Sequence, residues 1–239
     1  MASSYSTNAQ LEIITTGEKA GQWGGINNTN LQILEQTSTG VLDVDISAGS
    51  STLVLTDGAK STGKNIYLRL YGTLAASRTV TMPVTAERVW IMKDDTVRGA
   101  SNYTVGVLTA SGTTQPIPPG ATVLCKSNGS ETVVTILEKG YATITNSNTP
   151  YTAVAGAQIL ANTTSAVITV TLPAAASTGD EVTIIDARGT WGSNNLTVDR
   201  NGLNINSAAS NLTLITNGQS ITLVYVDATR GWAYKTNTA

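Results

Sequence analysis

The stretch NIYLRLYG, residues 65–72, places Ile66, Leu68 and Leu70 on one face of an extended chain. An alternation with a period of two predicts a half-buried β-strand. Comparable runs lie on both sides of it: VLDVDIS (41–47), STLVLT (51–56), RTVTMP (78–83), RVWIM (88–92), YTVGVL (103–108), ATVLCK (121–126) and TVVTIL (132–137). Short strands at regular spacing, with turn residues between them, predict a β-sandwich or a β-barrel.

The second half of the chain repeats this plan. ITVTLP (168–173) matches RTVTMP, and EVTIIDARGTWGSNNLTV (181–198) matches RVWIMKDDTVRGASNYTV (88–105). The stretch at 217–235 parallels the one at 119–137. We therefore expect a mainly β protein with two related antiparallel β-sandwich or barrel-like modules, residues 41–139 and residues 140–239.

Turn residues support hairpins between these strands. Four Asx-Gly dipeptides supply the positive φ angles that type I′ turns require. They are Asp57-Gly58, Asn128-Gly129, Asn201-Gly202 and Asn217-Gly218. The last two strands are expected to pair across a turn at residues 228–231.

The N-terminal segment, residues 1–40, is built differently from the rest. A short strand is expected at 10–15, followed by a glycine-rich loop. Asn27 is expected to cap a helix that runs to about Gln36, because an asparagine side chain can accept from the free N–H groups of a first turn. Gly40 then provides a stop signal.

Four apolar side chains of this segment are the candidate interface residues. Ile26 and Leu31 stand where a hydrophobic staple would place them, and Leu34 extends the apolar edge of the short helix. Trp23 lies in the loop before it. A helix of about ten residues is not stable alone, so we interpret residues 1–40 as a docking element.

The composition excludes several classes of function. The chain has 239 residues, a net charge of −2, 13% charged residues, no histidine and a single cysteine, Cys125. A catalytic triad with histidine is impossible, as is any histidine-containing metal site. Nucleic-acid binding needs a basic footprint, and a membrane span needs about 20 apolar residues. We expect no enzyme activity, cofactor, metal, nucleic-acid ligand or membrane insertion.

Two motifs invite a functional interpretation. GAKSTGKN (58–65) approaches a phosphate-binding loop, but Asn65 replaces the required Ser or Thr and a strand follows, so we expect a turn. The carboxylates Asp94-Asp95, Asp180-Glu181 and Asp186 lack the dense spacing of a calcium loop. A catalytic pair among them is a minor alternative.

Cys125 and Trp90 lie in apolar runs and are expected in the core. Trp191 lies in the turn-like RGTWGSNN and, with Asn194 and Asn195, is the candidate contact for a sugar receptor. Core or interface packing is the stronger expectation for Trp191, because buried aromatic residues outnumber exposed platforms.

Two stretches resemble a known family. LEIITTGEKAGQWGGINNTNLQILEQ (11–36) resembles the N-terminal signature of tail-fibre-like structural proteins of bacteriophages, particularly marine and cyanobacterial ones. The matching features are Thr16-Gly17-Glu18, Gly21–Gly24 and Asn28–Leu31. Residues 165–235 are similar to a β module that recurs in phage tail and fibre proteins, whereas 41–139 are linked to it through the internal repeat.

This resemblance implies a virion component, made in the host cytoplasm without a signal peptide. Residues 1–40 would attach it to other tail, baseplate or collar proteins, and the β modules would project toward a host-surface glycan. Fibres of this kind are commonly homotrimers, which protects sheet edges. Two alternatives stay open: a capsid-decorating, cement or head-fibre protein, and a glycan-binding lectin-like module.

Overall fold

The computed structural model describes residues 3–98 and 102–238, and the chain divides into two compact units. Unit 1 comprises the described residues of Met1–Val97, Thr104–Ile117 and Thr122–Leu137. Unit 2 comprises those of Arg98–Tyr103, Pro118–Ala121 and Glu138–Ala239. Each unit has its own hydrophobic core, and each is described by itself.

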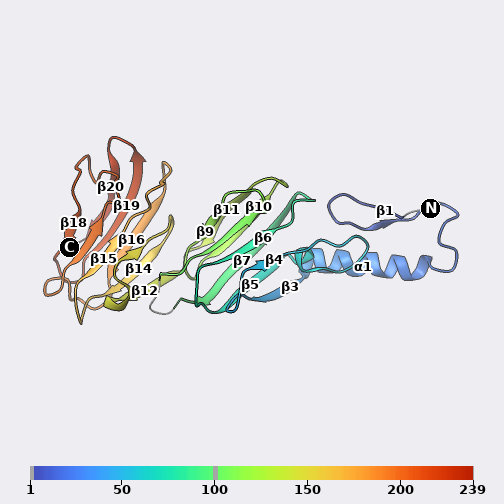
Figure 1. The fold of residues 1–239 in the computed structure, drawn as a ribbon, viewed down its shortest axis with the longest axis horizontal. Coiled ribbons are helices and arrows are strands. Elements are labelled where there is room, and N and C mark those ends of the chain that lie inside the picture. The colour runs from blue at the N-terminus through green and yellow to red at the C-terminus, as the bar shows by residue number, and fades with distance from the viewer. Residues whose placement is uncertain (1–2, 99–101, 239) are drawn as a thin grey trace. The chain divides into compact units, whose positions relative to one another are not determined.

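Unit 1 begins with a small hairpin and one helix. Strand β1 (Ser4–Tyr5) pairs with β2 (Glu12–Ile13), and helix α1 spans Trp23–Thr39 (Figure 1). The predicted N-cap at Asn27 is wrong, because α1 begins at Trp23 and its N-cap is Gln22, which makes no side-chain cap. The predicted stop at Gly40 is confirmed, since its N–H donates to Gln36 O at 2.9 Å.

The rest of unit 1 is a coil of strands in two sheets. Its elements are β3 (Val41–Asp45), β4 (Ser51–Thr52), η1 (Thr62–Lys64), β5 (Tyr67–Thr73), β6 (Arg78–Met82), β7 (Arg88–Val97), β8 (Val105–Thr109), β9 (Gln115–Ile117), β10 (Thr122–Ser127) and β11 (Thr132–Glu138). One sheet has the order β11-β10-β7-β5-β3, and the other has the order β4-β6-β8-β9. The pairs β3–β5, β5–β7, β4–β6 and β6–β8 are parallel.

Unit 2 has the same topology. Its elements are β12 (Tyr141–Thr145), η2 (Asn146–Asn148), β13 (Tyr151–Thr152), β14 (Gln158–Asn162), β15 (Ile168–Thr171), β16 (Glu181–Asp186), β17 (Leu196–Asp199), β18 (Leu212–Leu214), β19 (Ser220–Asp227) and β20 (Gly231–Thr238). The sheets have the orders β12-β14-β16-β19-β20 and β13-β15-β17-β18. The first three strands of each are again parallel.

The architecture is therefore a β-solenoid of about six turns with parallel sheets, three turns in each unit, and the predicted antiparallel sandwich or barrel-like modules are wrong. The chain passes from one sheet to the other at each corner and returns beside its own earlier strand. Val41 pairs with Tyr67, and Tyr67 pairs with Ile91, in successive turns. Period-two alternation is the same in parallel and antiparallel strands with one buried face, so it could not separate the two folds.

The turn residues were predicted in part. All four glycines of the Asx-Gly dipeptides have positive φ, but the residue before the glycine has positive φ only at Asn201. Asn128-Gly129 connects β10 and β11, and Asn201-Gly202 lies in the longer connection between β17 and β18; both are pairs of neighbouring strands. Asp57-Gly58 and Asn217-Gly218 lie between strands of different sheets. The expected turn at residues 228–231 is confirmed, because β19 and β20 pair across it.

The internal repeat corresponds to equivalent strands. Val80 and Val170 pair with the first-turn strands β4 and β13 in the same way, so RTVTMP and ITVTLP are equivalent. The sequence match of RVWIM to EVTIID aligns Trp90 with Thr183. The buried residue that corresponds to Trp90 is Val182, so the match is wrong by one residue. A slip of one residue exchanges the two faces of a strand.

Candidate functional site

Helix α1 has two apolar faces, and its own chain covers only one of them. Ile33 is fully buried and Ile26, seven residues earlier, is half-buried. Trp23, Leu31 and Leu34 are exposed by 62%, 56% and 44%. At 3.6 residues per turn these three lie within a sector of about 80° around the helix axis. We call Trp23, Leu31 and Leu34 the α1 outer stripe.

Two side-chain amides fix the orientation of α1. Asn30 Oδ1 accepts from the N–H of Glu12 at 3.0 Å, and Asn30 Nδ2 donates to Glu12 O at 2.9 Å. Gln36 pairs with the backbone of Ser61 in the same way, at 3.3 Å and 3.2 Å. Each side-chain amide thus forms the pair of hydrogen bonds that a peptide group of a neighbouring strand would form. Because one flank of the helix is held at two points, the outer stripe stays directed to solvent.

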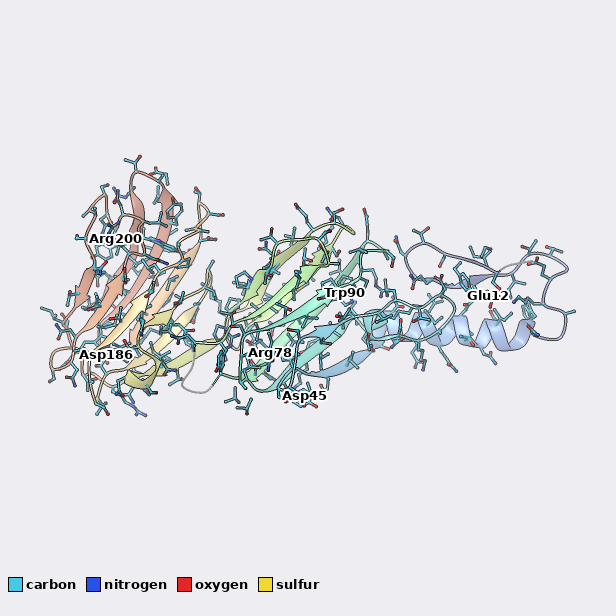
Figure 2. The ribbon with its side chains drawn as sticks, viewed as in Figure 1. Glu12, Asp45, Arg78, Trp90, Asp186 and Arg200 are labelled. Atoms are coloured by element: carbon cyan, nitrogen blue, oxygen red, sulfur yellow. The ribbon has the colours of Figure 1, made fainter. Side chains whose placement is uncertain are left out.

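Glu12 also joins the hairpin to the loop before α1 (Figure 2). Its carboxylate accepts from Ser3 Oγ at 2.8 Å and lies 3.0 Å from Lys19 Nζ. The hydrogen bond from Ser3, followed by the contact with Lys19, lowers the pKa of Glu12. Beside it lies a shallow open pocket of about 350 Å³. The pocket is lined by Glu12, Gly21, Gln22, Gly25, Ile26, Thr29, Asn30 and Gly58.

The predicted receptor contacts in unit 2 do not form one exposed site. Trp191 is fully buried in the unit 2 core, so its ring is not available for stacking on a sugar. Asn194 Nδ2 donates to Thr163 O and Thr164 O, at 2.9 Å and 3.2 Å, and Asn195 is exposed.

Asp186, in the same region, holds loops together (Figure 2). It is buried, and its Oδ2 accepts from the N–H groups of Trp191 and Gly218 at 3.2 Å and 3.0 Å. Its Oδ1 accepts from the N–H of Arg188 at 3.1 Å. A carboxylate committed to three backbone donors serves structure rather than proton transfer.

The phosphate-loop-like stretch is also used internally. Gly63 and Lys64 lie in the 3₁₀ turn η1, which leads to strand β5 and not to a helix. Lys64 is fully buried, and its Nζ donates to Thr56 O at 2.7 Å and to Ala59 O at 2.8 Å. Burial lowers the pKa of Lys64, and the charge of Arg88 acts in the same direction. The ammonium therefore organises its own loop.

Replacing Lys64 with alanine is expected to lower the free energy of unfolding by about 2–3 kcal/mol, because it leaves two carbonyl groups unpaired and opens a cavity. The midpoint of urea denaturation measures this loss. Lys60→Ala changes an exposed lysine of the same loop and should alter stability by less than about 0.5 kcal/mol. Equal midpoints for the two variants would contradict the role assigned to Lys64.

Cys125 and Trp90 are buried partners in neighbouring strands, and their predicted place in the core is confirmed. Trp90 Nε1 donates to Gly63 O at 2.9 Å, which ties the core to the η1 turn. Burial raises the pKa of the Cys125 thiol to about 12. The folded state therefore keeps this proton at a pH where the unfolded chain loses it.

We expect Cys125 to be inert toward a maleimide in the native protein at pH 8 and to react fully in 8 M urea. The free energy of unfolding should also fall as the pH rises from the pKa of an ordinary thiol toward 12, because the unfolded state then binds fewer protons than the folded state. Cys125→Ala should remove that part of the pH dependence. Rapid labelling under native conditions would show that the thiol is accessible.

Within residues 3–98 and 102–238, no grouping of three or more Cys, Asp or Glu side chains could hold a metal ion. In the same residues no helix is long and apolar enough to cross a membrane.

Comparisons with known proteins add no family. No family model matches the chain, and a search of curated proteins finds no match. A solved structure described as a chaperone–substrate complex resembles the chain with a TM-score of 0.37 and 15% sequence identity. That match covers 82% of this chain and 32% of the other, so the chain spans about a third of its length. A likeness at this level carries no argument about function.

Of the four predicted interface residues, Trp23, Leu31 and Leu34 form the outer stripe, whereas Ile26 is half-buried on the covered face of the helix. Ile33 and the two amide side chains, Asn30 and Gln36, were not singled out. The spacing of seven between Ile26 and Ile33 is a signal for a second apolar face. The amide contacts depend on segments far away in the sequence, and no local pattern predicts them.

Proposed function

We propose that the protein is a non-enzymatic structural subunit of a bacteriophage virion, in a tail fibre or a fibre associated with the tail or baseplate. The N-terminal segment attaches the subunit to another virion protein, and the two solenoid units project for host attachment. The observation that carries this proposal is the α1 outer stripe, which the chain presents on a helix fixed from its other side. The resemblance of residues 11–36 to phage fibre proteins points the same way.

The chemistry of the stripe suits attachment. An exposed tryptophan followed along the helix by two exposed leucines places large apolar surface in water, and such clusters typically mark protein interfaces. Tryptophan is enriched among the residues that dominate binding energy. Asn28 and Glu35, which lie beside Leu31 around the helix, are exposed and polar, so the stripe has a polar border on that side.

The solenoid units suit a structural role. The buried polar groups that invited a catalytic interpretation, Lys64 and Asp186, are bound to backbone groups of their own chain. Repeated coils also give a surface on which corner loops can vary without loss of the core. Several copies on one particle would strengthen weak contacts with a host, because linked sites gain effective concentration.

Gold-tagged antibody against residues 141–238 would test the proposal on intact virions of the phage whose genome encodes the chain. Label at the ends of tail appendages is the expected result. Label spread over the head would instead identify a decoration protein. Absence of label on every particle, with the epitope accessible on the free protein, would refute a virion role.

A further inference from the structure

An apolar row crosses the outer face of the five-stranded sheet of unit 1. Val41, Tyr67, Ile91 and Leu124 are in register on β3, β5, β7 and β10. Val41 is 65% exposed, and the other three are partly exposed. Their neighbours along the strands, such as Leu68 on β5, point into the core. The row therefore lies on the solvent side, where alternation normally places polar residues.

Val89 on β7 extends this apolar surface, since it is exposed and on the same face as Ile91. The edge strand β11 adds exposed Val133 and Leu137. Strands lie about 4.8 Å apart, so a row across four strands spans roughly 15 Å. This is a continuous surface and not a scatter of single residues.

The equivalent row of unit 2 is polar at three of its four positions. Tyr141, Gln158, Thr183 and Thr222 occupy the same register on β12, β14, β16 and β19. The hydroxyl groups of Thr183 and Thr222 lie 3.0 Å apart and share a hydrogen bond. Three of the four positions thus change from apolar in unit 1 to polar in unit 2, while both inner faces stay apolar. The fold itself does not require an apolar row.

The next row of unit 2 contains one apolar pair, Leu160 and Ile185, which is bounded by Thr143 and Ser220. It is shorter than the row of unit 1, which is apolar on all four strands. The two units share one topology, so the difference singles out the outer face of unit 1 as the candidate contact surface.

The charges on this face suit a second copy of the same chain. On β3, β5, β7 and β10 the outward positions carry three acidic and three basic residues: Asp43, Asp45, Asp95, Arg69, Lys93 and Lys126. Their net charge is zero, so two such faces do not repel each other. Arg69 already lies 2.7 Å from Asp95 and 3.8 Å from Asp43, which neutralises the centre of the face.

The two sides of the face differ in sign. Asp43 and Asp45 lie on the edge strand β3, whereas Lys126 lies on β10. When two such faces pack against each other about a two-fold axis parallel to the strands, the acidic side of one copy meets the basic side of the other, which is an isologous contact. A face with opposite charges at its sides is complementary to itself.

We propose that the outer face of the β11-β10-β7-β5-β3 sheet is a self-association surface, occupied by a second copy of this chain. The apolar row forms its centre, and the charged side chains around it set the orientation. This inference rests on the pairing register and the side-chain chemistry of unit 1. It does not depend on a virion role.

Unit 2 supplies the substitutions for a test. The variant Tyr67→Gln/Ile91→Thr/Leu124→Thr places the residues of the unit 2 row on the unit 1 face. Sedimentation velocity over a hundredfold range of concentration should show an oligomer for the wild-type full chain. The variant should be monomeric, or at least tenfold weaker in association, with an unchanged far-UV circular dichroism spectrum. If the triple variant does not fold, Ile91→Thr alone should weaken association in the same direction.

Thr183→Ser/Thr222→Ser, in the equivalent row of unit 2, is the matched control and should leave association unchanged. A wild-type chain that is monomeric at every concentration would overturn the proposal, because the face would then need a different partner. An unaltered oligomer in the triple variant would overturn it as well. Loss of association only when Leu31 and Leu34 are replaced would assign self-association to α1 instead.

Discussion

Gly231→Ala is expected to lower the free energy of unfolding of unit 2 by more than about 3 kcal/mol. Gly231 has φ of +70° at the start of β20, and an added methyl group would overlap the carbonyl group of Asn204. The obstacle is backbone, and Trp232 N donates to Asn204 O at 2.8 Å beside it. Neither side can move without breaking this contact. The midpoint of urea denaturation measures the loss.

Two other glycines separate the effect of positive φ from the effect of the overlap with the backbone. Gly202 also has positive φ, +87°, but a methyl group there would meet nothing within 4 Å, so Gly202→Ala should cost only about 1 kcal/mol. Gly24 lies in α1 with open space around it, and Gly24→Ala should stabilise the helix by about 0.5–1 kcal/mol. If Gly231→Ala were as stable as Gly202→Ala, the close approach of the Asn204 backbone to Gly231 would be contradicted.

Trp191→Ala and Trp232→Ala are each expected to cost about 3–5 kcal/mol, as for other large aromatic residues in a core. Both indole rings are fully buried, and Trp232 packs edge-on against Tyr225 with ring centroids 5.6 Å apart. Trp23→Ala removes the same side chain from an exposed position and should change stability by less than about 0.5 kcal/mol. Thermal unfolding of the three variants provides the comparison.

A Trp191 variant as stable as the Trp23 variant would mean that Trp191 is not a core residue. The expected order also bears on function. It assigns the tryptophan of α1 to a surface and that of the RGTWGSNN loop to packing, which was the stronger expectation for Trp191.

The sequence predicted strands well and their pairing poorly. Alternation in residues 65–72 located β5, and the repeat correctly matched RTVTMP to ITVTLP. Parallel pairing was missed, because alternation reports one buried face and says nothing about the direction of the neighbouring strand. Asx-Gly dipeptides favoured hairpins, yet Asp57-Gly58 and Asn217-Gly218 lie between strands of different sheets, and Asn201-Gly202 lies in the long connection between β17 and β18. The glycine has positive φ at all of them.

The stop of the helix at Gly40 was predicted correctly, but the helix runs to Thr39 and not to about Gln36, and its predicted start was wrong. Gly24 and Gly25 disfavour a helix, so the sequence placed the start at Asn27. The first turn forms nevertheless, and Asn30, at the end of the second turn, pairs with the backbone of Glu12. Tertiary contacts can override weak local propensity. Leu31 and Leu34 were recognisable from residue type and spacing, whereas Trp23 was expected in the loop before the helix. The apolar row of unit 1 became visible only once the parallel register was known.

The central claim is that the α1 outer stripe attaches the subunit to the virion. Its most direct test is incorporation of Trp23→Ala/Leu31→Ala/Leu34→Ala into purified particles, compared with the wild type. Alanine keeps the helix and removes the apolar surface. Asn28→Ala/Gln32→Ala/Glu35→Ala, at exposed polar positions of the same helix, is the control. We expect at least a tenfold loss for the stripe variant and normal incorporation for the control, whereas wild-type incorporation of the stripe variant would contradict the claim.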